Sequence, residues 1–174
     1  MQGHLIDCGP CPYLAQRRFH AFHPHPNPPA VPYRLLMDNR FRRSGNLLYM
    51  PMCPGCTACQ PVRIDVPAFD DGGVPGGELH ARDRDGRLIA VSVCDRFADA
   101  LSSVYCYYDP ELSARSLGTF MALAEIGFCH ANDLRWWYLG FLVRGSPKMA
   151  YKARFCPQEV LEDGVWVRYD EPVG

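Results

Sequence analysis

Two groups of cysteines, far apart in the chain, most constrain how its N-terminal part folds. The first group is Cys8-Gly-Pro-Cys11, and the second is Cys53-Pro-Gly-Cys56-Thr-Ala-Cys59. A Cys-x-x-Cys turn places two sulfurs where they can bind one metal ion, and two such turns complete a tetrahedral site of four thiolates. We therefore expect this part of the chain to be organised around a metal as well as around an apolar core.

The expected metal ligands are Cys8, Cys11, Cys56 and Cys59, with Cys53 as the alternative. Zinc fits a closed site of four thiolates, and an iron–sulfur cluster uses the same ligands, so both stay open. Nine cysteines in a chain with no evident export signal favour metal-bound or reduced thiols over disulfides. Four further cysteines lie in apolar segments and are expected to be small buried hydrophobic residues: Cys94, Cys106, Cys129 and Cys156.

The length and composition predict a protein with a real core and no membrane partner. The chain has 174 residues, of which 48% are hydrophobic, enough for one domain or two small ones. No apolar run approaches the roughly 18 residues that a membrane-spanning helix needs. The N-terminal residues also lack the basic and apolar regions of a signal peptide. We therefore expect a cytoplasmic location, and nothing in the sequence indicates an oligomeric state.

Charge and irregular segments divide the chain. Residues 1–65 carry seven Arg against three Asp, so this part is able to face phosphate. Residues 21–32 hold five prolines and are expected to be an irregular connector. A Gly-rich turn or linker at 70–77 then separates an N-terminal Cys-rich region, residues 1–69, from a C-terminal region, residues 78–174.

The apolar pattern predicts a mixed fold. Helices are expected at 33–40, 116–132 and 147–155, and strands at 46–51, 62–66, 87–95, 102–108, 135–141, 156–160 and 165–169. The order ββαβαββ in the C-terminal region is typical of a sheet covered by helices. The fold class is therefore predicted to be α/β (α+β), with the Cys-rich metal knuckle packed on a sheet-and-helix domain.

Two further motifs place groups that can bind an anion or a carbonyl oxygen beside a turn. Arg42 and Arg43 are adjacent beside a glycine turn, so they can clamp a phosphate or carboxylate, or be an exposed solubilising pair. A strand ending at Asp109 is soon followed by Arg115-Ser116-Leu117-Gly118, where a helix opens. Free amides there suit a phosphate or an acyl carbonyl. The alternative interpretation of Asp109 is an Asp-Pro turn with an ordinary helix cap.

The chain's two lysines lie close together, against sixteen arginines elsewhere. Lys148 and Lys152 are four residues apart, which places them on one face of the expected helix, with Tyr151 beside them and Arg154 following. Since arginine is otherwise the default cation, these lysines indicate a specific use. The alternative is a solvated helical face.

Several segments together resemble the aminoacyl-tRNA–protein transferases. They are Phe-Arg-Arg-Ser-Gly, Cys-x-x-Cys-x-x-Cys-Gln-Pro-Val-Arg, Tyr-Asp-Pro, Arg-Ser-Leu-Gly-Thr, Trp-Tyr-Leu-Gly-Phe and Lys-Met-Ala-Tyr-Lys-Ala-Arg-Phe-Cys-Pro. The chain resembles in particular the bacterial aspartate/glutamate leucyltransferases, relatives of the arginyl-tRNA–protein transferases, over residues 5–69 and about 78–170. Since several long motifs agree in family order, the resemblance is specific.

The resemblance implies an activity and a fold. An aminoacyl group, leucyl first and arginyl as the alternative, would move from its tRNA ester to the N-terminal Asp or Glu of a protein, which then enters N-degron proteolysis. The catalytic half would be similar to the N-acetyltransferase (GNAT) fold, shortened here, with aminoacyl-tRNA replacing acetyl-CoA. The acetyl-CoA loop is matched only in part at Arg115–Phe120, so no acetyl-CoA is expected. The N-terminal cysteines match the metal- or cluster-binding half of the family.

The family's reaction suggests residue roles. It joins an activated ester to a free amine, so it needs orientation, a proton acceptor and oxyanion donors. Asp109 or Tyr138 would accept the proton, and the amides near Leu117 and Gly118 would hold the oxyanion. Arg42 and Arg43 would bind the acidic side chain of the acceptor. The substrate- or tRNA-binding residues would be Arg115, Ser116, Lys148, Tyr151, Lys152 and Arg154.

One departure from the family leaves two other functions open. Family members carry several tens more residues between the strand ending near Phe69 and the strand starting near Gly86, including a basic stretch and the first helices of the catalytic half. The alternatives are a non-catalytic metal-knuckle module that binds tRNA or a protein partner, and a small N-acetyltransferase.

Overall fold

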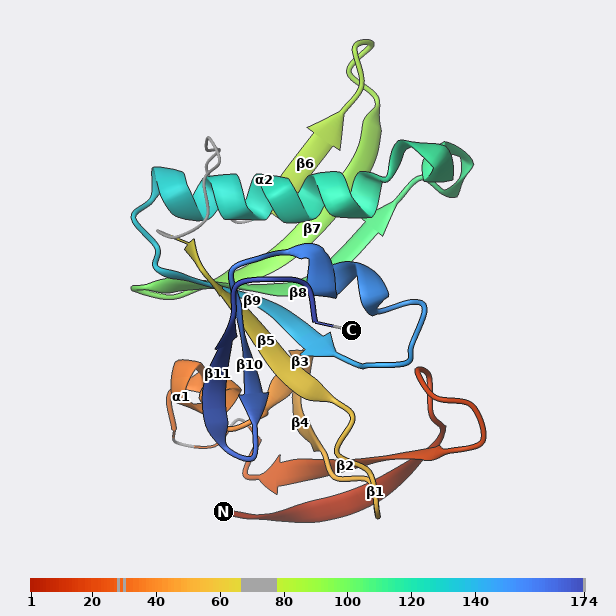
Figure 1. The fold of residues 1–174 in the computed structure, drawn as a ribbon, viewed down its shortest axis with the longest axis vertical. Coiled ribbons are helices and arrows are strands. Elements are labelled where there is room, and N and C mark those ends of the chain that lie inside the picture. Colours follow the sequence, from red (N-terminus) through yellow and green to blue (C-terminus); the bar gives the residue numbers. More distant parts are fainter. Residues whose placement is uncertain (28, 30, 67–77, 174) are drawn as a thin grey trace. The chain divides into compact units, whose positions relative to one another are not determined.

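The computed structural model describes residues 1–27, 29, 31–66 and 78–173 of the chain, drawn as a ribbon in Figure 1. These residues form two compact units. One consists of Met1–Val62 together with Gly140–Gly174, and the other of Arg63–Leu139. The expected division into residues 1–69 and 78–174 is therefore not how the chain separates, because its last part returns to the first unit. The turn expected at 70–77 lies outside the described residues.

The first unit contains a four-stranded antiparallel sheet with one helix. The strands are β1 (Gln2–Pro10), β2 (Arg18–His25), β3 (Arg42–Ser44) and β4 (Leu47–Pro51), in the order β1-β2-β4-β3. The helix is α1 (Tyr33–Asp38), as the sequence predicts. Its buried residue Leu36 packs with Phe41 and Leu48 to form a small core.

The prediction of an irregular connector is wrong at its start, because residues 21–25 belong to strand β2. The prolines hide this strand in the sequence. Pro24 has Gly3 of β1 opposite it, whereas β4 pairs with β2 only at Ala21 and Phe22. The absent amide of Pro24 therefore breaks no bond to β4. Gly3 is required for the close approach, because a Cβ there would lie 2.2 Å from the His23 carbonyl oxygen.

The C-terminal part of this unit adds a second set of strands. β10 (Gln158–Glu162) and β11 (Val165–Tyr169) form the expected antiparallel hairpin around Asp163 and Gly164. β5 (Gln60–Asp65), whose first residues belong to this unit, neighbours β10. A short 3-10 helix, η3 (Ala150–Arg154), takes the place of the helix expected at 147–155.

The second unit is a sheet covered by one long helix. β6 (Glu78–Arg82), β7 (Leu88–Arg96) and β8 (Ala100–Tyr108) are antiparallel neighbours, and β9 (Trp136–Leu142) runs parallel to β8. Helix α2 (Leu117–Ala131) lies across β6, β7 and β8 (Figure 1), and a short 3-10 helix, η2 (Pro110–Arg115), precedes it. The core between helix and sheet contains Leu79, Ala81, Ile89, Ala90, Leu117 and Met121.

The mixed α+β class predicted from the sequence is confirmed. The strands expected at 46–51, 62–66, 87–95 and 102–108 match β4, β5, β7 and β8 within two residues. In the part of the chain that the structure describes, no helix has both the length and the apolar character needed to cross a bilayer.

Candidate active site

The parallel pair of strands in the second unit separates partway along its length. β8 and β9 pair only through Ala100–Ser102 and Trp136–Tyr138. Beyond Ser102, β8 continues to Tyr108 paired with β7, with one register shift between Ser103 and Tyr105. Ligands in open sheets with parallel strands bind beyond the carboxyl ends of those strands. The loop after β8 is therefore the candidate position of the active site.

That loop ends in a helix start with unsatisfied donors. Ser116, the residue before α2, has a left-handed backbone (φ +52) and makes no side-chain cap. The amides of Thr119 and Phe120 both donate to the Ser116 carbonyl oxygen. The amides of Leu117 and Gly118, as the first of the helix, have no intrahelical acceptor, and none is present elsewhere among the described residues. Two adjacent N–H groups at this helix start are thus without a protein acceptor, and their predicted role as oxyanion donors stays a prediction.

A cavity of about 500 Å³ adjoins this helix start. Leu117 and Phe120 of α2 form part of its apolar wall, and Arg115 lies in the same lining. The edge strand β6 contributes polar groups, including His80 and Arg82. The structure therefore places Arg115 and Leu117, two of the predicted site residues, in one cavity.

Asp109 acts as a helix cap, so the alternative interpretation of this residue is confirmed. One carboxylate oxygen accepts a hydrogen bond from the Glu111 amide at 3.0 Å. The other forms an ion pair with Arg87. The side chain is only 13% exposed. Both carboxylate oxygens therefore already have partners. Nothing in the structure tests whether Asp109 accepts a proton, so that role stays a prediction.

Tyr138, the other predicted proton acceptor, is completely buried. Its hydroxyl accepts a hydrogen bond from Arg63 at 3.2 Å. The guanidinium of Arg63 also stacks on the ring of Trp136, 3.9 Å from its centroid. As placed, this hydroxyl is a partner of Arg63 in the sheet and is not open to an incoming amine.

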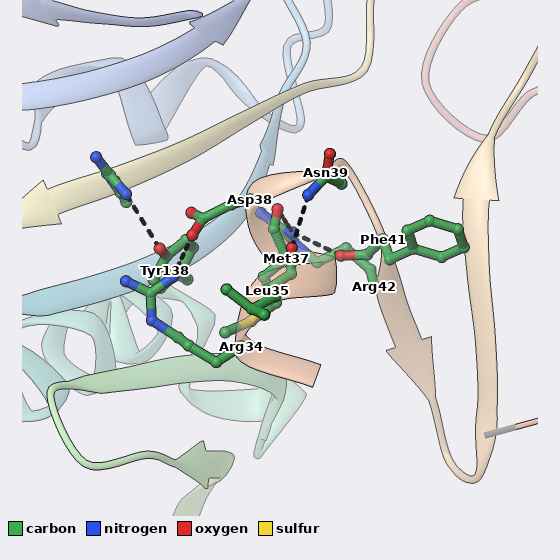
Figure 2. A network of polar contacts seen from close by, with 9 residues as sticks. Arg34, Leu35, Met37, Asp38, Asn39, Phe41, Arg42 and Tyr138 are labelled. Atoms are coloured by element: carbon green, nitrogen blue, oxygen red, sulfur yellow. Dashed lines mark hydrogen bonds and ion pairs between the residues drawn. The ribbon is translucent and has the colours of Figure 1, made fainter. Parts of the chain in front are cut away.

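Arg42 is buried, which does not fit its predicted contact with substrate. Its Nη1 donates to the carbonyl oxygens of Met37 and Phe41, at 3.1 and 2.7 Å (Figure 2). Its guanidinium also lies 5.2 Å from the ring centroid of Phe141. Arg42 therefore closes the end of α1. Arg43 is half-buried and donates to the carbonyl of Gly45 at 2.7 Å.

The predicted lysine face does not exist in the structure. Lys148 precedes the 3-10 helix η3 and is exposed, whereas Lys152 is 93% buried and donates to the carbonyl oxygen of Phe141 at 3.0 Å. The prediction that Lys152 binds tRNA is therefore corrected, because its ammonium group is enclosed. Tyr151 and Arg154 are exposed and stay candidates.

Only some of the predicted cysteine ligands lie near one another. Burial raises the pKa of the Cys59 thiol to about 12, and the nearby thiols of Cys53, Cys11 and Cys56 add to the rise. Cys8 is exposed, and its sulfur is directed at the carbonyl of Ile6. No three or more His, Cys, Asp or Glu side chains among the described residues are arranged to hold a metal ion. The residues as placed do not fit a four-thiolate site, and metal binding stays a prediction.

Of the four isolated cysteines expected to be buried, the structure buries only Cys129. Cys129 is fully buried, and burial raises the pKa of its thiol to about 12. Cys94, Cys106 and Cys156 are only half-buried, although burial raises their thiol pKa values too. Cys106 packs against the core between α2 and the sheet, whereas the sulfur of Cys156 contacts the Ala153 carbonyl oxygen and the Gln158 side chain.

One buried acid was missed in the sequence. Glu125 on α2 is 1% exposed and accepts hydrogen bonds from Ser92, Ser103 and Trp137. Its signal was an acid within an apolar helix. The sequence alone does not distinguish it from the acids that lie on the solvent face of a helix.

A family model described as "Arginine-tRNA-protein transferase, C terminus" matches residues 39–162, well over half of the chain. The chain belongs to this family. The arginine-tRNA–protein transferases are aminoacyltransferases, so the resemblance and the enzyme class predicted from the sequence are confirmed. The matched residues include the loop after β8, the start of α2 and strand β10.

Curated relatives agree over most of the chain. An aspartate/glutamate leucyltransferase of Allorhizobium ampelinum is 32% identical over 99% of this chain and 95% of its own length. Proteins of the same name from Gluconacetobacter diazotrophicus and Vibrio cholerae are 30% and 29% identical, over 92% and 93% of this chain. The aligned regions cover 85% and 94% of the length of those two relatives.

These relatives also carry residues that have no counterpart here. The comparison with the Allorhizobium protein runs over 241 positions, although this chain has only 174 residues. The difference agrees in size with the several tens of residues expected to be missing from the catalytic half.

Proposed function

We propose that this chain transfers a leucyl group from leucyl-tRNA to the N-terminal Asp or Glu of a protein, and that the product enters N-degron proteolysis in the cytoplasm. The shared name of the curated relatives, aspartate/glutamate leucyltransferase, supports this choice of donor and acceptor. The observation that carries the proposal is the pair of open amides at Leu117 and Gly118, beyond the point where β8 and β9 separate.

In the proposed reaction, the amine nitrogen attacks the ester carbonyl carbon and the carbonyl oxygen becomes an oxyanion. The amides of Leu117 and Gly118 donate hydrogen bonds to that oxyanion. One such donor contributes about 3–4 kcal/mol of transition-state stabilisation. The intermediate then collapses, the bond to the ribose oxygen breaks, and the tRNA leaves with a hydroxyl group.

The amine must lose a proton on the way. Of the two predicted acceptors, Asp109 lies in the same loop as the open amides, whereas Tyr138 is enclosed in the sheet. The proposal therefore keeps Asp109, whose capping bond also fixes the loop. Arg115 and Ser116 are adjacent to the amides and suit the terminal phosphates of the tRNA.

The strand order and the separation of β8 from β9 support an acetyltransferase-like catalytic half in which aminoacyl-tRNA replaces acetyl-CoA. Binding of zinc or an iron–sulfur cluster by the cysteines is proposed separately, and no step of the reaction depends on it. Metal analysis of the purified protein and of Cys56→Ser tests it, with stoichiometric metal lost in the variant as the expected result.

One experiment tests the activity. The protein is incubated with leucyl-tRNA or arginyl-tRNA and a peptide that begins with Asp or Glu, and the peptide mass is followed. A leucyl mass increase supports the proposal, and an arginyl increase corrects the donor. The residues absent relative to the family favour a second candidate, a tRNA-binding module without catalysis. Binding of tRNA without transfer would identify that module, and turnover of acetyl-CoA would identify an N-acetyltransferase.

A further inference from the structure

A second cavity, in the unit that carries the cysteines, has two arginines in its wall. Its volume is about 420 Å³, and it lies beside the start of β5 and the turn between β10 and β11. The lining consists of Arg40, Thr57, Cys59, Gln60, Arg144, Leu161, Glu162, Asp163 and Gly164. Neither arginine was among the residues predicted to bind substrate.

Arg144 is held in a fixed orientation. Its Nη1 donates to the side-chain oxygen of Gln60 at 2.7 Å, and its Nη2 donates to Glu162 at 2.9 Å. The Glu162 carboxylate also accepts a hydrogen bond from the Tyr169 hydroxyl at 3.1 Å. The hydrogen bond from Arg144 lowers the pKa of Glu162, so this partner is ionised at neutral pH. Because two of its five donors already have partners, the guanidinium plane is fixed and the other donors are held in a rigid arrangement.

Arg40 occupies a backbone position that normally favours glycine. Its φ is +68, in the left-handed region, and its amide donates to Met37 while the next amide, of Phe41, donates to Leu36. This is the bond pattern of a helix C-terminus, where glycine is preferred. An arginine kept at such a position indicates a use for its side chain. The guanidinium makes one long hydrogen bond, 3.5 Å to the Cys59 carbonyl, among the residues that the structure describes.

We propose that this cavity binds the acidic side chain of the acceptor's first residue, with its carboxylate between Arg40 and Arg144. The inference rests on the proposed function, since the acceptor begins with Asp or Glu. Arginine forks match the two oxygens of a carboxylate, and both arginines line one cavity. Asp163 gives the same cavity a negative group that matches the positive amino end beside that carboxylate. Arg42, the residue first expected here, is buried in the core of its unit.

The decisive variant is Arg40→Gly, because glycine suits the left-handed backbone while the charge is removed. Two peptides are compared that differ only in a first residue of Asp or Asn. We expect kcat/KM for the Asp peptide to fall about tenfold to a hundredfold, as for the loss of a charged hydrogen bond, with little change for the Asn peptide. Arg144→Gln is expected to act the same way. Arg17→Gln is the matched control, since Arg17 also donates to one carbonyl, that of Gly55.

Other outcomes are equally decisive. An equal loss for both peptides, or no loss in Arg40→Gly, overturns the inference, and the melting temperature of each variant identifies misfolding. If the wild-type chain transfers nothing, the proposed function fails, and the two peptides are titrated into the protein by NMR instead. Binding of the Asp peptide that is lost in Arg40→Gly then supports the cavity assignment, and absent or equal binding of both peptides overturns it.

Discussion

Glu125 on helix α2 accepts a hydrogen bond from the indole nitrogen of Trp137 on β9, at 2.7 Å. The same carboxylate accepts hydrogen bonds from Ser92 on β7 and from Ser103 on β8. Ser103 directly follows Ser102, the last residue of β8 that pairs with β9. One buried side chain therefore joins the helix to three strands at the point where two of them separate, next to the elements that form the candidate active site.

Replacing this acid with a hydrocarbon is expected to destabilise the second unit. In Glu125→Leu, the buried indole of Trp137 and the hydroxyl of Ser92 lose their acceptor. An unsatisfied buried donor costs about 1–3 kcal/mol, so the free energy of unfolding in urea should fall by at least that amount. Glu111→Leu, at an exposed position, is the control and should change little. Equal stability of the two variants would show that the network contributes nothing.

The stability should also depend on pH through Glu125. Burial raises the pKa of its carboxyl above the ordinary 4.5, although the hydrogen bonds from Ser92, Trp137 and Ser103 oppose the rise. Since the folded pKa is the higher one, the stabilisation is complete below the unfolded pKa and is lost as pH rises through the folded pKa. The free energy of unfolding of the wild type should therefore fall, relative to that of Glu125→Gln, as the pH rises above 4.5, the ordinary pKa of a glutamate. Urea unfolding across that range measures this, and a difference independent of pH would refute it.

Two substitutions at Asp109 separate capping from proton transfer. Asparagine keeps an oxygen for the Glu111 amide but removes the charge, whereas alanine removes both. If Asp109 accepts the amine's proton, both variants should lower kcat by about a hundredfold or more. Asp109→Ala alone should also lose about 1 kcal/mol of stability, because the cap is lost. Full activity in Asp109→Asn would leave the residue as a cap and nothing more.

The two lysines should respond to mutation in opposite ways. Lys152→Met removes a buried charged hydrogen bond to the Phe141 carbonyl and should reduce the free energy of unfolding by about 1.5–3 kcal/mol. Lys148→Ala, at an exposed site, should leave stability unchanged and weaken tRNA binding, most clearly at low salt. Denaturation and tRNA titration measure the two effects. If Lys152→Met weakened tRNA binding without loss of stability, the exposed lysine face expected from the sequence would be supported instead.

Most helices and strands could be predicted from the sequence, because the spacing of apolar residues reflects the local geometry of a helix or a strand. The helix at α2 and the strands at β7, β8 and β9 follow their periodicity closely. β2 was missed because its prolines resemble a loop, and only the pairing with β1 shows that Pro24 can be accommodated.

Site residues were less predictable, because their exposure depends on contacts between distant segments. Arginines two residues apart resemble each other in sequence, yet Arg42 packs over Phe141, which is far along the chain, while Arg40 lines a cavity. Lys152 was expected to share an exposed helical face with Lys148, but η3 begins only at Ala150, so the two lysines do not belong to one helix.

The most direct test of the account is the rate of leucyl transfer to an Asp-initiated peptide by Gly118→Pro and Gly118→Ala. Both residues are tolerated in the first turn of a helix, but only proline removes the amide proposed to hold the oxyanion. A Cβ at Gly118 makes only an ordinary contact, 3.6 Å from Tyr108. The account predicts transfer by wild type and Gly118→Ala and a loss of about a hundredfold to a thousandfold in Gly118→Pro. Transfer by Gly118→Pro at the wild-type rate, or none by the wild-type protein, would contradict it.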